Sequence, residues 1–296
     1  MSAFKSGFVN IIGFPNAGKS TLINQFIGEK IAIVSPKVQT TRQRILGFLN
    51  TDQYQVIFSD TPGILEPAYE LQKVMMDEIN EAFEDADIIL YILEVNDTPD
   101  KHQTYIEKIV SLNIPFYLLL NKIDLSNQQE VEKKIAQWQK WVDPSRIVPM
   151  SALHNFNVQS LLDEIVKHLP EHEAYYDEDI LTDKTERFVA AETIREKIFL
   201  KYQQEIPYAC EVEVLSFKEE EDLIRISAEI YVERKSQKPI LIGKGGEALK
   251  VIGTEARLEM EKFFDKKIFL ELHVKVRENW KSDPLFLKKM GYRTKE

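Results

Sequence analysis

The most constraining feature of this sequence is a glycine-rich segment with the pattern G-x-x-x-x-G-K-S at residues 13–20. An apolar run at residues 8–12 precedes it, and residues that favour a helix follow it. Glycines let the backbone curl so that successive N–H groups and the N-terminus of the next helix point at one anion, which makes this pattern a phosphate-binding loop. We expect the phosphates to be contacted by Gly13, Asn16, Ala17, Gly18, Lys19, Ser20 and Thr21.

A second motif, Asp-Thr-Pro-Gly at residues 60–63, follows the apolar run at residues 54–58. The carboxyl ends of parallel strands meet at one edge of an open sheet, so Asp60 is expected beside the phosphate loop. There Ser20 would ligate magnesium and Asp60 would hold it through water. Gly63 would offer its N–H to a γ-phosphate and act as the pivot of a loop that moves when this phosphate leaves. Alone, this motif would be an ordinary turn, and its order after the phosphate loop supports the functional interpretation.

The motif Asn-Lys-x-Asp at residues 121–124 indicates which base is bound. The carboxylate of Asp124 can accept hydrogen bonds from the ring N–H and the amino group of guanine, a pair that adenine does not offer. Two such bonds, at roughly 1.5 to 3 kcal/mol each, separate GTP from ATP by orders of magnitude. The sequence therefore predicts a GTP and GDP site and disfavours an ATP-dependent kinase. Supporting contacts are expected from Asn121, which ties loops together, Lys122, which packs along the base, and the backbone at Ser151 and Ala152.

The first part of the chain alternates short apolar runs with helix-period segments, which is typical of a parallel sheet covered by helices on both faces. Strands are expected at residues 8–12, 54–58, 88–93, 116–120 and 146–150. A helical stripe ends before Pro170, and the polar, acidic stretch after it shows neither helical nor strand periodicity. We predict a nucleotide-binding domain at residues 1–170, a linker at 171–186 and a second domain at 187–296.

The second domain has a different pattern of elements: helix, strand, strand, helix, helix, strand. Residues 224–232 alternate, so that Ile224 and Ile226 would face a core while Glu229 and Tyr231 would face outward. A G-x-x-G loop stands between the last two helices, formed by Gly243, Lys244, Gly245 and Gly246 after Ile242. A lone loop of this kind is more often a flexible turn. In this order of elements it matches a type II KH domain, whose loop clamps about four nucleotides of a single strand.

The formal net charge of −10 argues against nucleic-acid binding over the whole surface, because a uniformly acidic protein repels a polyanion. A local basic face in the second domain remains compatible with RNA, and affinity should then fall as salt rises. Many of the residues that could form such a face will merely be solvated. The candidates are Lys250, Arg257, Lys262, Lys266, Lys267, Lys275, Arg277, Lys281, Lys288 and Lys289.

These motifs together resemble the translation-factor-like GTPases, and the form G-x-P-N-A-G-K-S resembles the branch that contains the Era family. Residues Gln39, Thr40, Thr41 and Arg42 match the first switch of that family. The resemblance implies that a threonine here closes over magnesium when GTP is bound. Thr41 is favoured over Thr40, with little to separate them.

One position departs from Ras-like enzymes: Ile64 stands where a glutamine would orient the attacking water, so intrinsic GTP hydrolysis should be slow. The resemblance implies that Asn16 helps to hold a potassium ion at the phosphates, which would add positive charge there. Magnesium and potassium are thus the expected cations.

The resemblance to the Era family extends over nearly the whole chain and implies the partners. The expected fold is an α/β P-loop GTPase domain, with a mainly parallel sheet, followed by an α+β type II KH domain. That domain would bind the 3′ end of 16S ribosomal RNA during maturation of the 30S subunit, and GTP would favour the RNA-binding conformation. A monomer in the cytoplasm is expected, with peripheral contact to the inner face of the cell membrane for part of the molecules. The alternative is a GTPase scaffold whose second domain binds protein or a membrane surface.

Overall fold

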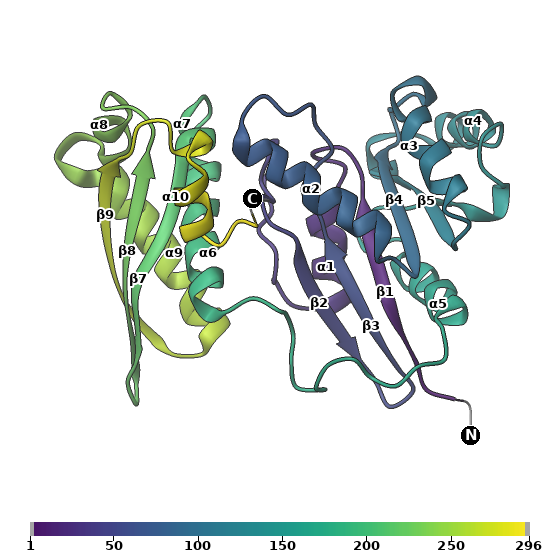
Figure 1. The fold of residues 1–296 in the computed structure, drawn as a ribbon, viewed down its shortest axis with the longest axis horizontal. Coiled ribbons are helices and arrows are strands. Elements are labelled where there is room, and N and C mark those ends of the chain that lie inside the picture. The colour runs from purple at the N-terminus through teal and green to yellow at the C-terminus, as the bar shows by residue number, and fades with distance from the viewer. Residues whose placement is uncertain (1–2, 294–296) are drawn as a thin grey trace. The chain divides into compact units, whose positions relative to one another are not determined.

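The computed structural model describes residues 3–293, and the chain divides into two compact units. The first unit runs up to Asp183, except for residues 33–40 and 67–74, which belong to the second unit together with the chain from Lys184 onward. Each unit has its own sheet, one of six strands and one of three (Figure 1).

The sheet of the first unit has the strand order β2-β3-β1-β4-β5-β6. The expected strands are all present, and neighbouring strands are parallel except for β2, which pairs antiparallel with β3. The edge strand β2 was not predicted from the sequence. The bounds are β1 Lys5–Ile12, β2 Ile45–Asn50, β3 Tyr54–Asp60, β4 Ile88–Glu94, β5 Phe116–Asn121 and β6 Ile147–Pro149.

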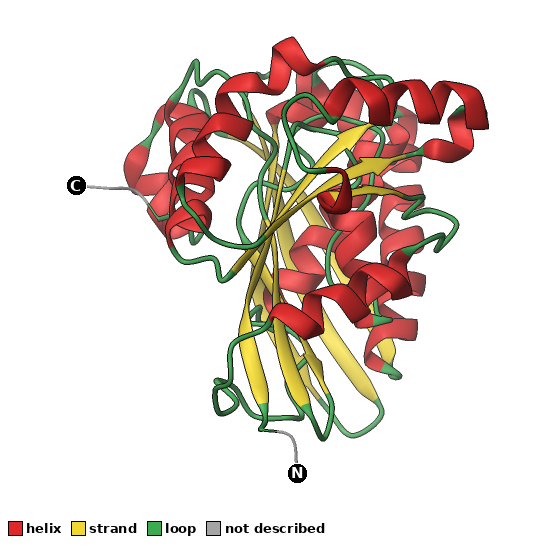
Figure 2. Cartoon of the chain, turned by 90° about the vertical axis from the view of Figure 1, so that its right-hand side faces the viewer, coloured by secondary structure: helices red, strands yellow, loops and turns green. Residues whose placement is uncertain are grey.

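Helices cover both faces of this sheet, as expected (Figure 2). One face packs on α2, α3 and α4 through a core that includes Ile79, Ile106 and the fully buried Trp138. On the other face, α1 contacts β2, β3 and α5. The bounds are α1 Lys19–Ile27, α2 Glu70–Glu84, α3 Pro99–Ser111, α4 Gln128–Trp138 and α5 Val158–His168.

The segment expected to be a linker lies along the edge of this sheet for most of its length. Phe48 donates its backbone N–H to Leu181 O at 3.0 Å, and Thr182 Oγ1 donates to Leu46 O at 2.6 Å. The side chain of Gln55 also donates to Tyr176 O at 2.8 Å. These bonds satisfy backbone groups that a bare edge strand would expose.

The second unit follows the predicted order of elements around one sheet, β7-β8-β9. Strands β7 and β8 are antiparallel, β8 and β9 are parallel, and the apolar faces of α6 and α9 pack on the sheet. Ile224, Ile226 and Ala228 are buried in this core, as predicted. The bounds are α6 Glu186–Lys201, α7 Ile206–Ala209, β7 Cys210–Glu219, β8 Leu223–Val232, α8 Gln237–Ile242, α9 Glu247–Phe264, β9 Lys267–Val276 and α10 Pro284–Lys289.

The prediction that Glu229 and Tyr231 on β8 face outward is wrong, because both side chains are buried. The ring of Phe286 in α10 lies 5.1 Å from the ring of Tyr231, so a helix at the end of the chain covers this face. The Tyr231 hydroxyl donates to Glu229 Oε2 at 2.7 Å, and burial together with this carboxylate raises the pKa of Tyr231.

None of the helices described has both the length and the apolar character that crossing a bilayer requires.

Candidate nucleotide site and nucleic-acid groove

The phosphate loop joins β1 to α1 with a backbone that glycine permits. Gly18 has φ of 104°, in the left-handed region, and α1 begins at the next residue. A Cβ at Gly13 would lie 2.2 Å from Ile92 O, so this position has no room for a side chain. The loop and the start of α1 therefore have the strand-loop-helix arrangement that the motif predicts for an anion-binding site.

Lys19 is held inside this loop. Its Nζ donates to Gly13 O at 3.0 Å and to Phe14 O at 2.9 Å. Burial lowers the pKa of Lys19 to about 8, and the nearby carboxylate of Asp60 opposes this shift. A phosphate would supply the negative charge that the buried ammonium requires.

Three oxygen-bearing side chains expected at magnesium lie together at the end of β3. Ser20 Oγ donates to Asp60 Oδ2 at 2.7 Å, and Thr41 Oγ1 lies 2.9 Å from Ser20 Oγ and 3.1 Å from Asp60 Oδ2. Asp60 is fully buried, and among the described residues its Oδ1 has no hydrogen-bond partner. Burial raises the pKa of Asp60, and Ser20, Lys19 and Thr41 oppose this shift only in part. A hard divalent cation with oxygen ligands fits this arrangement, because it would give a partner to the Asp60 oxygen that has none among the described residues.

The two candidate threonines of the first switch have different surroundings. Thr40 Oγ1 makes hydrogen bonds of 2.7 Å with Ser35 Oγ and with Lys37 O, within the loop that precedes it. Thr41, by contrast, points to Asp60. The geometry thus favours Thr41. The flanking residues are Gln39, whose Oε1 accepts from Tyr69 at 3.0 Å, and the buried Arg42.

Gly63 lies against the phosphate loop, where a Cβ would come within 2.8 Å of Pro15 N. The next residue, Ile64, donates its N–H to Gly13 O at 3.1 Å, and its side chain is buried. The motif after β3 is therefore in direct backbone contact with the phosphate loop. Its aliphatic residue contributes no group that could orient water.

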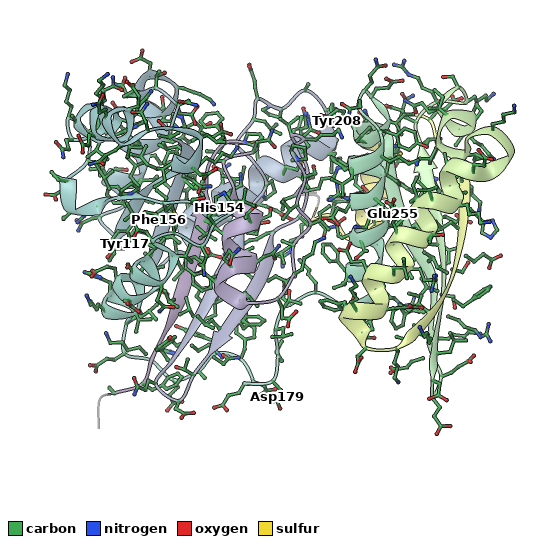
Figure 3. The ribbon with its side chains drawn as sticks, turned by 180° about the vertical axis from the view of Figure 1, so that it is seen from behind. Tyr117, His154, Phe156, Asp179, Tyr208 and Glu255 are labelled. Atoms are coloured by element: carbon green, nitrogen blue, oxygen red, sulfur yellow. The ribbon has the colours of Figure 1, made fainter. Side chains whose placement is uncertain are left out.

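The side chain of Asn121 connects the loops expected to bind phosphate and base. Its Nδ2 donates to Ala17 O at 2.8 Å, and its Oδ1 accepts from Ala152 N at 2.9 Å. Asp124 Oδ1 accepts from Ser151 Oγ at 2.5 Å, which fixes the carboxylate expected to read guanine. His154 and Phe156 follow in the same loop (Figure 3).

Two contacts of this base loop were missed from the sequence. Glu94 at the end of β4 forms an ion pair of 2.6 Å with Lys122 Nζ, which orients the lysine stem. Ser151 was expected to act through its backbone, yet its hydroxyl holds Asp124. Only the fold brings the carboxyl ends of β4, β5 and β6 together, so the motifs alone gave no sign of either contact.

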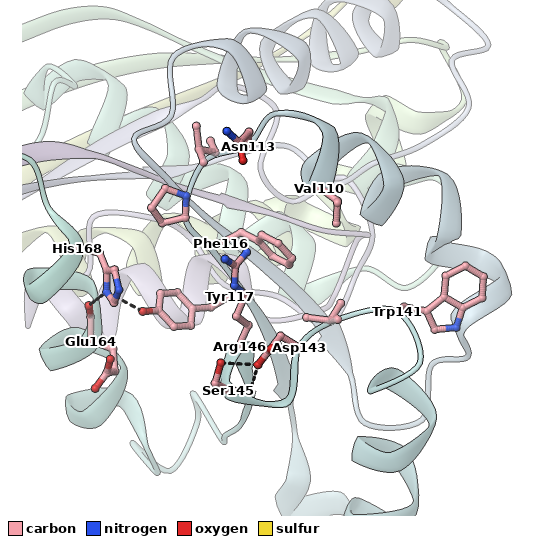
Figure 4. A pocket seen from close by; sticks show the side chains of 13 residues that line it. Val110, Asn113, Phe116, Tyr117, Trp141, Asp143, Ser145, Arg146, Glu164 and His168 are labelled. Carbon is pink, nitrogen blue, oxygen red and sulfur yellow. Dashed lines mark hydrogen bonds between the residues drawn. The ribbon is translucent and has the colours of Figure 1, made fainter.

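A separate pocket of about 790 Å³ lies at the other end of β5 (Figure 4). Phe116 and Tyr117 line it at the start of the strand, whereas Asn121 ends the strand at the nucleotide loops. Trp141 lines this pocket and is 37% exposed. The pocket therefore lies apart from the residues expected to bind nucleotide.

The G-x-x-G loop of the second unit depends on glycine at each of its three glycine positions. Gly243, Gly245 and Gly246 have φ of 76°, 62° and 83°, in the left-handed region. Ile242 ends α8, and Lys244 is exposed between the glycines. A Cβ at Gly245 or Gly246 would meet no atom within 4 Å, so the backbone there is open to a ligand.

A groove of about 350 Å³ starts at this loop and runs between α9 and β9. Gly253 allows the two elements to approach, since a Cβ there would lie 3.3 Å from Leu272. Sequence analysis singled out only the loop and the cations, because leucines on an alternating strand look like core. The lining residues are Gly246, Leu249, Lys250, Gly253, Thr254, Arg257, Leu270 and Leu272.

Most of the basic residues proposed from the sequence are neutralised by neighbouring carboxylates. Lys266, for example, pairs with Glu219 at 2.6 Å, and Arg257 pairs with Glu261 at 2.7 Å. Within residues 3–293, Lys244 and Lys250 make no ion pair and lie exposed at the loop and the groove. The loop and the groove therefore carry positive charge that these two lysines supply.

Known proteins with similar sequences and structures share both units. Residues 8–122 match the family described as 50S ribosome-binding GTPase, and residues 205–281 match the KH domain family. GTPase Era of Syntrophus aciditrophicus (strain SB) is 47% identical over 292 residues, which cover 98% of this chain and 95% of that protein. GTPase Era of Geobacter metallireducens is also 47% identical, covering 98% of each chain.

Solved structures agree over the same extent. The crystal structure of Era in complex with MgGDPNP and nucleotides 1506–1542 of 16S ribosomal RNA matches with a TM-score of 0.94 at 38% identity, covering 98% of this chain and all of that one. A variant of Aquifex aeolicus Era bound to GDP and aluminium fluoride matches with a TM-score of 0.93 at 38% identity, with the same coverage. The nucleotide motifs, the KH fold and these similarities agree, and the chain belongs to the Era family of GTPases.

Proposed function

We propose that this GTPase is a nucleotide-controlled switch that binds the 3′ end of 16S ribosomal RNA and assists maturation of the 30S subunit. The observation that carries the proposal is that one chain combines a carboxylate held in place at Asp124, within the Asn-Lys-x-Asp motif, with an open G-x-x-G loop and groove. The similarity to an Era structure that contains this RNA supports the choice of partner.

In the nucleotide half, Ser20, Thr41 and Asp60 would hold Mg²⁺. The ion would supply charge that stabilises the transferring phosphoryl group. Lys19 would exchange its contacts with loop carbonyls for the phosphates. Thr41 would report the γ-phosphate, because its hydroxyl already lies beside the expected cation ligands.

Potassium would add a second cation near Asn16, in the place where other GTPases use an arginine. This part of the proposal has a direct test. Hydrolysis should be faster in potassium than in sodium at equal ionic strength, and Asn16→Ala should remove the difference. Equal rates in both salts would exclude a role for potassium.

In the RNA half, bases of a single strand would enter the groove over Leu270 and Leu272 while Lys244 and Lys250 meet phosphates. RNA should be crosslinked to the chain in cells, recovered and sequenced. The 3′ end of 16S ribosomal RNA should be enriched, and a Gly245→Asp, Gly246→Asp variant should lose it. Enrichment that survives these substitutions would contradict the role of the loop.

The same proposal includes a monomeric chain in the cytoplasm, with a fraction in peripheral contact with the membrane. Sedimentation with and without GTP tests the monomer. Flotation with anionic vesicles tests the membrane contact, since binding should be absent from neutral vesicles. Vesicle binding that abolishes RNA binding would favour a membrane scaffold over an RNA switch.

A further inference from the structure

A second polar network lies beside the magnesium-ligand cluster and is not used by the chemistry described above. Its centre is Arg44, three residues after Thr41 and directly before β2. The Arg44 guanidinium reaches β1, β3 and the end of α2, a helix that crosses this part of the sheet (Figure 1). Its side chain is only 14% exposed.

The network includes one buried polar side chain from β1 and one from β3. Asn10 and Ser59 are both fully buried, and they are direct neighbours in the pairing of β1 with β3. Arg44 Nε donates to Ser59 Oγ at 2.5 Å, and Nη2 donates to Asn10 Oδ1 at 3.1 Å. Burying a polar group without a partner is costly, so these two side chains depend on the guanidinium.

The same guanidinium is fixed from the side of α2. Asp85 accepts from Arg44 Nη1 at 2.5 Å and from Nη2 at 3.0 Å, an arrangement with two parallel bonds. Asn10 Nδ2 donates to Asp85 Oδ1 at 2.7 Å and to Ala82 O at 2.7 Å. The backbone N–H of Arg44 is also bound, by the carboxylate of Glu78.

Both the backbone and the side chain of Arg44 are therefore tied to the body of the sheet and to α2. Three residues of extended chain span only about 10 Å, so this anchor limits how far Thr41 can move from Asp60. The loop can release its threonine when the γ-phosphate leaves, and residue 44 stays in place as the end of the moving segment. The anchor also connects the first switch to the helix that follows Gly63.

We propose that Arg44 is a positioning residue for the GTP-bound state, which holds Thr41 within reach of magnesium through the Asn10–Ser59–Asp85 network. This inference rests on the proposed function, because it assumes that Thr41 senses the γ-phosphate. It assigns Arg44 no contact with nucleotide. The positioning of Thr41 by Arg44 should favour the binding of GTP over GDP, since Thr41 has no γ-phosphate to sense in the GDP state.

The test is nucleotide affinity by calorimetry for Arg44→Met and Asp85→Asn in saturating magnesium. Affinity for a non-hydrolysable GTP analogue should fall by about tenfold, the size expected for loss of a charge-assisted hydrogen bond, while GDP affinity changes less than about twofold. Arg146→Ala, which removes an exposed arginine over Phe116 at the far side of the sheet, should change neither. Equal losses for both nucleotides would overturn the proposal and leave Arg44 a purely structural residue.

A double-mutant cycle shows whether Arg44 acts through Thr41. In a Thr41→Ala background, Arg44→Met should have little further effect on affinity for the GTP analogue, because the residue that it positions is gone. Additive losses would overturn the proposal. If the unmodified chain itself failed to prefer guanine nucleotides, the proposed function would fail first, and that outcome is distinct from additivity.

Discussion

At the scale of single residues, the proposed recognition of guanine depends on one carboxylate whose orientation is fixed. Asp124 is held by Ser151 Oγ at 2.5 Å, and Asn121 ties the same loop to the phosphate loop through Ala17. The loops expected to bind the base and the phosphates thus share a hydrogen bond made by Asn121. Asp124 bonds to Ser151, so a substitution at Asp124 removes no hydrogen bond to Ala17.

Asp124→Asn should weaken GTP binding by at least about tenfold and improve xanthosine triphosphate binding, because an amide donates to the 2-carbonyl oxygen of xanthine where the carboxylate accepted from guanine. Competition binding with both nucleotides measures the exchange. Asp163→Asn, on α5 away from the base loop, is the matched control and should change neither affinity. Retained preference for GTP would mean that another group reads the base.

The neighbouring threonines show what the sequence could not decide. Thr40 and Thr41 have the same chemistry and adjacent positions, so pattern reasoning favoured one only weakly. In the fold, Thr40 is engaged by Ser35 and Lys37, whereas Thr41 lies at Asp60. The motif predicted which residue type would meet the cation, and the path of the loop places Thr41 beside the other candidate ligands.

At the scale of elements, the connection from β4 to α3 is fixed by a partly buried acid, Asp97. Burial would raise the pKa of Asp97, but His102, whose Nε2 lies 3.4 Å from Asp97 Oδ2, and the backbone hydrogen bond from the N–H of Glu94 outweigh it and hold this pKa at about 2. A carboxylate with a depressed pKa stabilises the fold above its ordinary pKa of 3.8, and this stability is lost as the pH falls toward about 2.

Asp97→Asn should therefore lower the free energy of unfolding by about 2 kcal/mol at pH 7, and the difference should shrink at pH 3. Urea unfolding of both chains at the two pH values measures this. Asp100 is exposed in the first turn of α3. Asp100→Asn should change the free energy of unfolding only slightly, without the decrease of the effect from pH 7 to pH 3. A difference that is independent of pH would show that the packing of Asp97, not its charge, is what matters.

The groove between α9 and β9 makes a prediction about salt. Lys244→Ala and Lys250→Ala should each weaken RNA binding and lower the slope of log affinity against log salt by about one, because each removes one phosphate contact. Lys266→Ala is the control, since that lysine is paired with Glu219 and does not line the groove. Titrations at several salt concentrations would contradict this account if all three variants had the slope of the unmodified chain.

The elements that the sequence predicted are those whose signal is local. The apolar runs of β3, β4 and β5 are buried along nearly their whole length, so short unbroken hydrophobic segments marked them. The edge strand β2 was missed because it contains Gly47 and its pairing depends on β3 and on the chain around Leu181. The burial of Tyr231 was missed because α10, far along the chain, covers it.

At the scale of the whole molecule, a net charge of −10 coexists with a loop and groove where, within the described part of the chain, Lys244 and Lys250 form no ion pair. The first unit reads a guanine nucleotide, and the second carries a loop open to a single strand. Era family membership accounts for both in one chain. The account requires that the nucleotide bound in one half changes the RNA affinity of the other.

The most direct test of this claim is RNA affinity measured with each nucleotide in the unmodified chain and in Asp124→Asn. RNA from the 3′ end of 16S ribosomal RNA should bind the unmodified chain more tightly with a GTP analogue than with GDP. In Asp124→Asn, an analogue of xanthosine triphosphate should produce that gain and the GTP analogue should not. RNA affinity that is the same with every nucleotide, or a GTP response that survives the substitution, would contradict the account.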